Sequence, residues 1–334
     1  MERNKLADCF IAPPYSVIDA RKGEWKTRKR MWQKQLGEVS GSREGKLYSG
    51  LAFRMPDLYM RSKEERKKLG VTFEEYVKYY VPDAVVEKEM SKAAFSGVST
   101  FDPALAEIIY HWFTPGPDSR IFDCFAGDHT KGYVAAKSGH RFTGIEIRPE
   151  QVTLNNNAVS ALRDRVRYIQ DDGRNVNNHL GYATQDLLIS CPPYYNLEQY
   201  SADDASSLPS YAEFIAVLRE AFRSASDCLK SNRFAVVVVS DIRDSEGFYL
   251  GFPEDLIAMF RDFGFGLWND LIYLHNDCHG WLRAKQYINN RKVVRVHQRM
   301  LVFYKGNPHN IAKYFPKLKK DSVSNDTGSN IEEN

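Results

Sequence analysis

An uninterrupted apolar run in the second half of the chain indicates how this protein builds its sheet. The segment Ala235-Val236-Val237-Val238-Val239 contains no polar position. Such a run is typical of a central parallel strand that is covered on both faces. From about residue 95 onward, predicted strands alternate with predicted helices, and this order favours an α/β fold with a doubly wound, mostly parallel sheet. Sheets of this kind bind ligands at the carboxyl ends of their strands.

The predicted elements follow one another through short connections. A helix is expected from Pro103, with Asp102 as its N-cap, and it should stop at Pro115. The last two strands are expected to form an antiparallel pair with a basic insertion, residues 276–299, between them. Strands are predicted at 120–124, 141–147, 166–170, 186–190, 233–240, 268–274 and 300–304, and helices at 131–137, 149–161, 211–230 and 253–263.

Three parts are expected along the chain. Residues 1–94 are interpreted as an N-terminal extension, in which Thr72 and Glu75 form a capping-box pattern that starts a helix. Residues 95–306 carry the alternating pattern and form the main domain. Residues 307–334 are interpreted as a C-terminal tail that is disordered from about residue 317, because its composition becomes strongly polar there.

Composition excludes several classes of protein. Apolar residues make up 43% and charged residues 27% of the chain, which is ordinary for a soluble globular protein. Since no run of 18 apolar residues exists, no membrane span is expected, and the first residues lack the apolar core of a signal peptide. Five scattered cysteines favour free thiols in a reducing compartment, and hence a cytoplasmic location.

The distribution of charge is more informative than the net value of +3. Residues 21–34 contain seven basic residues and one acidic residue, and residues 281–299 contain six basic residues and no acidic one. Both runs include Trp or Tyr, a combination that suits phosphates and unstacked bases, although a solvated charged face has the same pattern. The candidate DNA-binding residues are Arg28, Lys29, Arg30, Arg283, Lys285, Arg291, Lys292 and Arg295.

The strand predicted from residue 120 ends in a turn suited to a nucleotide-like ligand. Its sequence is Ile-Phe-Asp-Cys-Phe-Ala-Gly, residues 121–127. Gly127 allows close approach of the backbone, and the helix that follows points its N-terminus at the ligand. Glu146 ends the next strand, where a carboxylate can accept hydrogen bonds from both ribose hydroxyls, and Asp172 follows the third strand.

A second motif, Ile-Ser-Cys-Pro-Pro-Tyr-Tyr at residues 189–195, follows in the same domain. Together the two segments resemble the "FxG" and "(D/N/S)PP(Y/F/W)" motifs of amino-methyltransferases that act on DNA bases. Residues 297–306 resemble the "H-E-x-x-L-x-F-x-K" ending of many of these enzymes. Residues 8–14 and 28–32 resemble the N-terminal extension of DNA methylases carried by phages and plasmids.

This resemblance implies a Rossmann-like methyltransferase sheet with S-adenosylmethionine as cofactor. It places Asp172 near the adenine amino group of the cofactor, and residues 97–102 over its methionine end. The implied substrate is double-stranded DNA, and the subfamily favours adenine N6 over cytosine N4. The implied cofactor-binding residues are Thr100, Phe101, Asp123, Phe125, Ala126, Gly127, Glu146 and Asp172.

An exocyclic base amine is a poor nucleophile, because its lone pair is delocalised into the ring. Catalysis therefore needs acceptors for its N–H groups and a methyl donor held in line. The resemblance assigns one acceptor to Cys191 and the other to the carbonyl of Pro192, in a turn made rigid by Pro193. Tyr194 is then expected to stack on the flipped base.

Two departures from the family keep alternatives open. Cys191 stands where the family has Asp, Asn or Ser, and thiol sulfur is a weak acceptor. Residues 128–130, Asp-His-Thr, replace a small "GSG"-like stretch. A DNA-binding module with a degenerate site is therefore an alternative. An RNA or protein-glutamine methyltransferase is another, because those enzymes also use an "NPPY"-type loop. Cysteine-based carbon-5 methylation of cytosine fits less well, since the catalytic cysteine follows the prolines in those enzymes.

No metal site is predicted. His275, Asp277, Cys278 and His279 lie close together in the sequence, but four residues within five positions cannot easily surround one ion. We prefer the interpretation that these four residues belong to a polar turn at the end of a strand. Oligomeric state, recognition sequence and biological role stay open.

Overall fold

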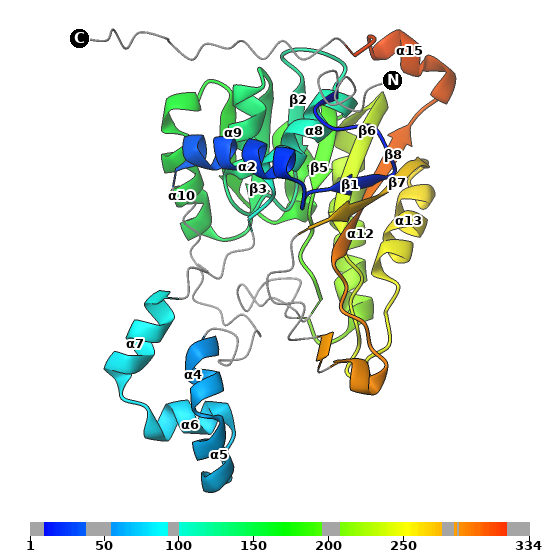
Figure 1. Cartoon of the computed structure of the whole chain (residues 1–334). Coiled ribbons are helices and arrows are strands. Elements are labelled where there is room, and N and C mark those ends of the chain that lie inside the picture. Colours follow the sequence, from blue (N-terminus) through cyan, green and yellow to red (C-terminus); the bar gives the residue numbers. More distant parts are fainter. Residues whose placement is uncertain are drawn as a thin grey trace, which may run out of the picture.

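The computed structural model describes residues 10–37, 55–92, 100–195, 208–275, 284–285 and 287–318. The central feature of this part is an eight-stranded sheet with the order β1-β7-β8-β6-β5-β2-β3-β4 (Figure 1). Strands β2 to β6 run parallel, and β8 runs antiparallel to both β6 and β7. The predicted Rossmann-like fold with a final antiparallel pair is confirmed.

All seven predicted strands are present, most of them with boundaries shifted by a few residues. From β2 the chain winds first outward to β3 and β4, and then returns to β5 on the other side of β2. In doubly wound sheets ligands bind where the strand order reverses, and here that point is at the carboxyl ends of β2 and β5. The strands are β1 (Val17–Asp19), β2 (Arg120–Asp123), β3 (Arg141–Glu146), β4 (Val166–Gln170), β5 (Gln185–Ser190), β6 (Leu229–Val239), β7 (Gly266–Leu274) and β8 (His297–Lys305).

Helices cover both faces of the sheet, which explains the uninterrupted apolar run in β6. Phe234, Val236 and Val238 face one layer, whereas Ala235, Val237 and Val239 face the other. The first layer contains α2 (Gly23–Leu36), α8 (Pro103–Phe113), α9 (Thr130–Lys137) and α10 (Pro149–Ala158), and α15 (Ile311–Tyr314) borders it. The second contains α11 (Val176–Leu180), α12 (Tyr211–Cys228) and α13 (Phe252–Asp262).

The N-terminal segment supplies two elements that the sequence did not reveal as part of this fold. Strand β1 pairs in parallel with β7 at the edge of the sheet. Helix α2 buries Trp25 and Trp32 in the same core as α8 and α9. Residues 17–36 therefore complete the sheet domain, because both tryptophans are removed from water in the core that α8, α9 and β7 share.

Four further helices form a separate small cluster. They are α4 (Pro56–Arg61), α5 (Lys63–Leu69), α6 (Phe73–Tyr80) and α7 (Asp83–Lys92). Their core contains Met55, Leu58, Phe73, Tyr76 and Val77 and belongs to neither layer of the sheet. The predicted capping box is confirmed, since Thr72 accepts from Glu75 N while the Glu75 carboxylate accepts from Thr72 N. In the part of the chain described above, no helix has the length and apolar character that crossing a bilayer requires.

Candidate active site at the carboxyl ends of the strands

The two sequence motifs meet side by side. Strand β2 pairs with β5 through Ile121 opposite Leu187 and Phe122 opposite Leu188. Just beyond this pairing, Ser190 Oγ donates a hydrogen bond of 2.7 Å to Asp123 Oδ1, and both residues are completely buried. The structure therefore brings the predicted cofactor loop and the predicted catalytic loop to one edge of the sheet. We call this edge, formed by the carboxyl ends of β2 to β7, the catalytic edge.

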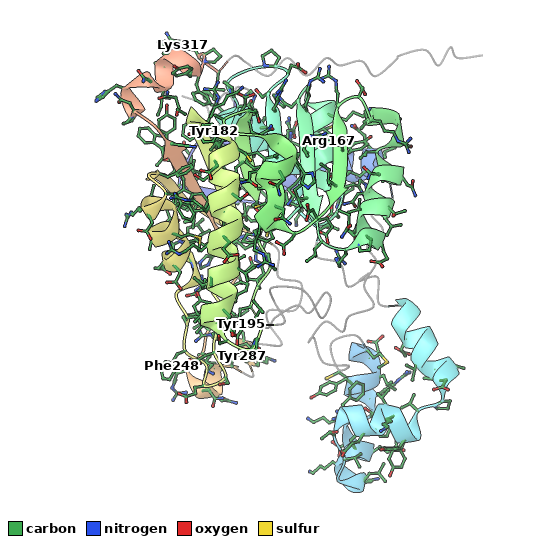
Figure 2. All side chains as sticks on the ribbon, turned by 180° about the vertical axis from the view of Figure 1, so that it is seen from behind. Arg167, Tyr182, Tyr195, Phe248, Tyr287 and Lys317 are labelled. Carbon is green, nitrogen blue, oxygen red and sulfur yellow. The ribbon has the colours of Figure 1, made fainter. Side chains whose placement is uncertain are left out.

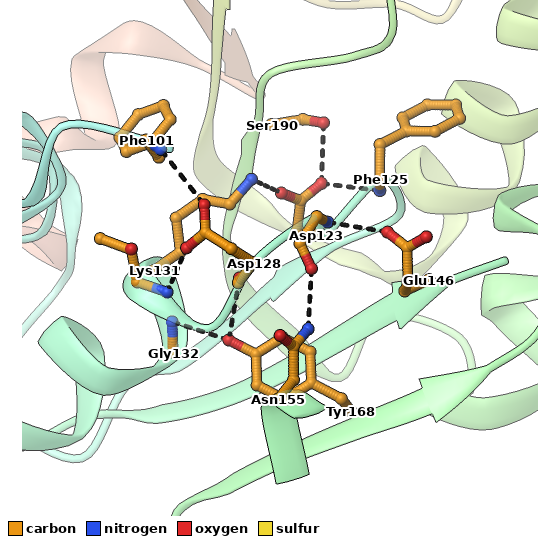
Figure 3. A network of polar contacts seen from close by, with 12 residues as sticks. Phe101, Asp123, Phe125, Asp128, Lys131, Gly132, Glu146, Asn155, Tyr168 and Ser190 are labelled. Carbon is orange, nitrogen blue, oxygen red and sulfur yellow. Dashed lines mark hydrogen bonds and ion pairs between the residues drawn. The ribbon is translucent and has the colours of Figure 1, made fainter. Parts of the chain in front are cut away.

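Asp123 is the hub of a buried polar network (Figure 3). Its Oδ1 also accepts from Phe125 N at 2.8 Å, and its Oδ2 forms an ion pair with Lys131 Nζ. Burial alone would lower the pKa of Lys131, but the charge of Asp123 and its hydrogen bond outweigh that effect and raise it. Lys131 is therefore a buried ammonium at the start of α9, and sequence reasoning missed it because lysines are mostly exposed.

The Gly127 loop is held through its backbone. Gly127 has a φ of +61°, and no atom lies within 4 Å of the place where a Cβ would stand. Its N–H donates to Glu146 Oε2 at 3.0 Å, and its carbonyl accepts from Asn155 Nδ2 at 2.7 Å. The loop thus leaves open space beside its glycine while its peptide groups are fixed.

Asp128, a departure from the motif that the sequence resembles, has a structural role. Its Oδ1 accepts from Thr130 N at 2.6 Å, and its Oδ2 accepts from Phe101 N at 3.4 Å. The ring of Phe101 in turn lies over Lys131 Nζ at 5.3 Å. The unusual loop therefore ties the segment before α8 to the start of α9. Thr100 is exposed and Ala126 is buried, while residues 97–99 lie outside the described residues.

The two predicted carboxylates stand at the ends of β3 and β4, as the sequence indicates. Glu146 is 8% exposed, and its Oε1 accepts from Arg148 N and Nε at 3.1 and 2.9 Å. Burial raises the pKa of Glu146, and Arg148 opposes the rise. Asp172 accepts from Arg174 N at 2.8 Å and forms an ion pair with the Arg174 guanidinium at 2.9 Å. Each carboxylate is therefore oriented by an arginine two residues later.

The predicted catalytic loop is anchored by the hydroxyl of Tyr194, a role that the sequence did not indicate. Pro192 is buried, and Cys191, Pro193 and Tyr194 are half-buried. Tyr194 Oη accepts from Ser240 N and from Gln298 Nε2, both at 3.0 Å. Its ring meets the ring of Phe252 in an edge-to-face contact at 6.2 Å. The aromatic residue of this motif is thus fixed to the ends of β6 and β8.

Some candidate DNA-binding residues have partners within the fold. Arg28 Nη2 donates to Glu107 at 2.6 Å, and Lys29 pairs with Asp102 at 3.0 Å. Both carboxylates belong to or cap α8, so these two cations hold α2 in place. Arg30 is exposed, and in the insertion Lys285 and Arg291 are exposed while Lys292 and Arg295 are half-buried. Arg283 lies outside the described residues, as do Asp277, Cys278 and His279.

No family model matches the sequence, and no curated protein matches it either. Among solved structures the chain is similar to TrmN from Thermus thermophilus, with 15% identity, 66% of this chain and 53% of TrmN covered, and a TM-score of 0.42. The chain thus spans about half the length of that protein. It is also similar to a candidate DNA modification methylase from the same organism (19% identity, 41% and 51% covered, TM-score 0.32). A third similar structure is a SAM-dependent methyltransferase from Methanosarcina mazei (12% identity, 57% and 93% covered, TM-score 0.39). At identities below 25% and TM-scores below 0.5, these similarities assign neither a family nor an activity to the chain.

Proposed function

We propose that this protein is an S-adenosylmethionine-dependent DNA methyltransferase that modifies an exocyclic base amine, adenine N6 in preference to cytosine N4. The observation that carries the proposal is the bond from Ser190 to Asp123, because it joins the loop of Gly127 to the loop of Cys191. A cofactor on the first loop and a base amine on the second would then be neighbours. The preference for adenine rests on the sequence resemblance.

The residues around Gly127 fit the proposed cofactor. The glycine offers open space beside a fixed backbone, and Glu146 presents a buried carboxylate at the strand end where ribose hydroxyls are bound in dinucleotide sites. Phe125 is half-buried and packs against Phe222 at 5.5 Å, so one part of its ring remains available to a ligand. Bound there, S-adenosylmethionine would supply an activated methyl group on sulfur.

The loop of residues 191–194 fits the substrate base. Tyr194 is held by two hydrogen bonds to its hydroxyl, so its ring has a fixed orientation at the catalytic edge. A base stacked on this ring would direct its amine to the Pro192 carbonyl oxygen and the Cys191 sulfur. These two atoms would accept hydrogen bonds from the N–H groups and so localise the lone pair on the nitrogen. This geometry lowers the barrier by positioning and by electrostatic stabilisation.

Nucleoside mass spectrometry tests the reaction. DNA and RNA are incubated separately with the protein and S-adenosylmethionine, digested and analysed. N6-methyladenine in DNA supports the proposal, and N4-methylcytosine would support the second amino target. Methylation of RNA alone would contradict the DNA assignment, and 5-methylcytosine would contradict amine chemistry altogether.

The weak acceptor at Cys191 favours one rival, a DNA-binding module with a degenerate methyltransferase site. Calorimetry distinguishes the two functions, because a binding module does not need to retain affinity for S-adenosylmethionine. DNA binding without cofactor binding and without a methylated product would establish the rival.

A further inference from the structure

A rigid turn at the catalytic edge presents an exposed phenylalanine. The chain leaves β6 at Ser240 and forms a tight turn over residues 244–248, where Asp244 N donates to Phe248 O at 2.9 Å. The Asp244 carboxylate accepts from Gly247 N at 2.7 Å and from Phe248 N at 2.8 Å. Arg243 Nη1 donates to Gly247 O at 2.6 Å. These hydrogen bonds fix the tip that carries Phe248.

Phe248 itself is 69% exposed. Single exposed apolar side chains are common on protein surfaces, so the case for a partner depends on the residues that surround Phe248. The next residue, Tyr249, lies under two guanidinium groups, those of Arg243 at 3.7 Å and Arg295 at 4.6 Å. Arg295 comes from the basic insertion, and Lys292 of the same insertion packs against Gly247. The turn and the insertion therefore form one surface.

This surface is joined directly to the catalytic loop. Ser240, which precedes the turn, donates its N–H to Tyr194 Oη. Asp241 closes the base of the loop by accepting from Gly251 N and Phe252 N, both at 3.1 Å. Phe248 and Tyr287 lie at the same end of the molecule as Tyr195, whereas Tyr182 lies at the opposite end (Figure 2). Phe248 therefore lies at the end of the molecule that carries Tyr195, the residue after Tyr194.

Charge and ring chemistry together favour a nucleic acid as the partner. Tyr287 and Val293 of the insertion are exposed in addition to Phe248. The charged residues within 281–299 are all basic. Lys285 and Arg291 are exposed, whereas Arg295 and Arg299 pair with Asp241 and Asp270 within the fold. Glu246 is the exposed acidic residue of the turn itself. Phosphates are attracted by the basic charges, and bases stack on exposed rings. Drawing one base out of a duplex also leaves a gap, and apolar side chains inserted between base steps stabilise distorted DNA.

We propose that Phe248 stacks within the DNA duplex next to the nucleotide whose base enters the pocket at Tyr194. The inference rests on the proposed DNA methyltransferase function and assigns to the 243–249 turn the role of holding the opened duplex. Arg243 and Arg295 stiffen the turn through Tyr249, and Phe248 is the residue that contacts bases.

Binding of fluorescein-labelled duplex DNA of random sequence tests this, measured by anisotropy over a series of salt concentrations. We compare the wild type with Phe248→Ala, Phe248→Trp and the matched control Tyr182→Ala, which removes a 78% exposed ring at the opposite edge. Phe248→Ala is expected to raise the dissociation constant about tenfold at every salt concentration, because one stacked base is lost. The salt slope should stay unchanged, since no charge is removed. Phe248→Trp and Tyr182→Ala should bind like the wild type.

Equal binding by Phe248→Ala and the wild type would overturn the inference, as would an equal loss in Phe248→Trp or in Tyr182→Ala. A loss seen with RNA but not with DNA would overturn the assignment to DNA. The nucleoside assay distinguishes a failure of the inference about Phe248 from a failure of the proposed DNA methyltransferase function. If the wild type methylates DNA while Phe248→Ala binds normally, only the role of Phe248 falls. If the wild type neither binds nor methylates DNA, both proposals fall.

Discussion

Ser190 and Asp123 form a completely buried hydrogen bond of 2.7 Å that joins the ends of β5 and β2. Ser190 directly precedes Cys191, and Asp123 directly precedes the turn to Gly127. The two loops therefore cannot move independently at their bases, which matters for a reaction that requires cofactor and substrate to be aligned.

The ion pair of Lys131 with Asp123 should dominate the stability of this region. Both side chains are buried, so Lys131→Met leaves an unpaired carboxylate and should lower the free energy of unfolding by about 3–5 kcal/mol. The double variant Lys131→Met/Asp123→Asn should be less destabilised, because it removes both charges. Urea denaturation of the two single variants and the double variant measures the coupling. Additive effects would show that the two charges do not interact.

Glu146→Ala should weaken binding of S-adenosylmethionine by about 1.5–3 kcal/mol, since bonds to a charged group are lost. The exposed Glu150 in the adjacent helix α10 provides a matched control, and Glu150→Ala should leave affinity unchanged. Calorimetry gives both dissociation constants. An unchanged constant for Glu146→Ala would remove Glu146 from the cofactor site.

The same calorimetry, repeated across pH, should show the effect of the raised pKa of Glu146. Only the ionised carboxylate offers two negatively charged acceptor oxygens, so affinity should be full above the raised pKa and fall as the pH drops through it. The loss of affinity should begin at a higher pH than it would with a glutamate of ordinary pKa, and the pH dependence should be absent in Glu146→Gln.

The effect of the raised pKa on folding stability has the opposite sign. A buried acid with a raised pKa stabilises the fold below its unfolded pKa, and this contribution is lost as the pH rises through the folded pKa.

Substitutions of Tyr194 should distinguish base stacking on its ring from anchoring of the loop by its hydroxyl. Tyr194→Phe keeps the ring but leaves Ser240 N and Gln298 Nε2 without their acceptor, which should cost about 1–3 kcal/mol of stability while much methylation remains. Tyr194→Ala should lose stability and nearly all methylation. Thermal unfolding and product formation are measured on both variants. A fully active Tyr194→Ala variant would exclude base stacking on this ring.

Cys191→Ser and Cys191→Asn should stay active, because both side chains accept hydrogen bonds. A covalent carbon-5 mechanism would instead be abolished by either change and would trap DNA that contains 5-fluorocytosine. Product identification by mass spectrometry decides between them. An inactive Cys191→Ser that still binds cofactor and DNA, together with 5-methylcytosine from the wild type, would replace the amino-methyltransferase proposal.

The basic insertion should contribute to DNA affinity through charge. Arg291→Ala removes one exposed cation and should reduce the log–log salt slope of DNA binding by about 0.9 if that cation contacts a phosphate. Lys313→Ala in α15 serves as the control, and cofactor affinity should not change in either variant. An unaltered slope for Arg291→Ala would make this residue an ordinary solvated charge.

Local signals in the sequence determined most of the sheet and the positions of both loops. The apolar run of Ala235 to Val239, the capping box of Thr72 and the glycine and proline turns predict their elements because each depends on neighbours within a few residues. Glu146 and Asp172 could also be placed, since the carboxyl ends of parallel strands lie at one edge.

Only the tertiary structure decided which groups meet across long distances in the chain. Strand β1 has three residues and is stabilised by pairing with β7, whose sequence lies far away, so its own pattern carries too little information. The basic run predicts that Arg28 contacts nucleic acid, but in the structure Arg28 pairs with Glu107 of α8. The sequence around Lys131 does not distinguish it from a surface lysine, whereas the fold buries it beside Asp123. A charged side chain has the same sequence signature whether its partner is water, a phosphate or a buried carboxylate, and the fold alone supplies that partner.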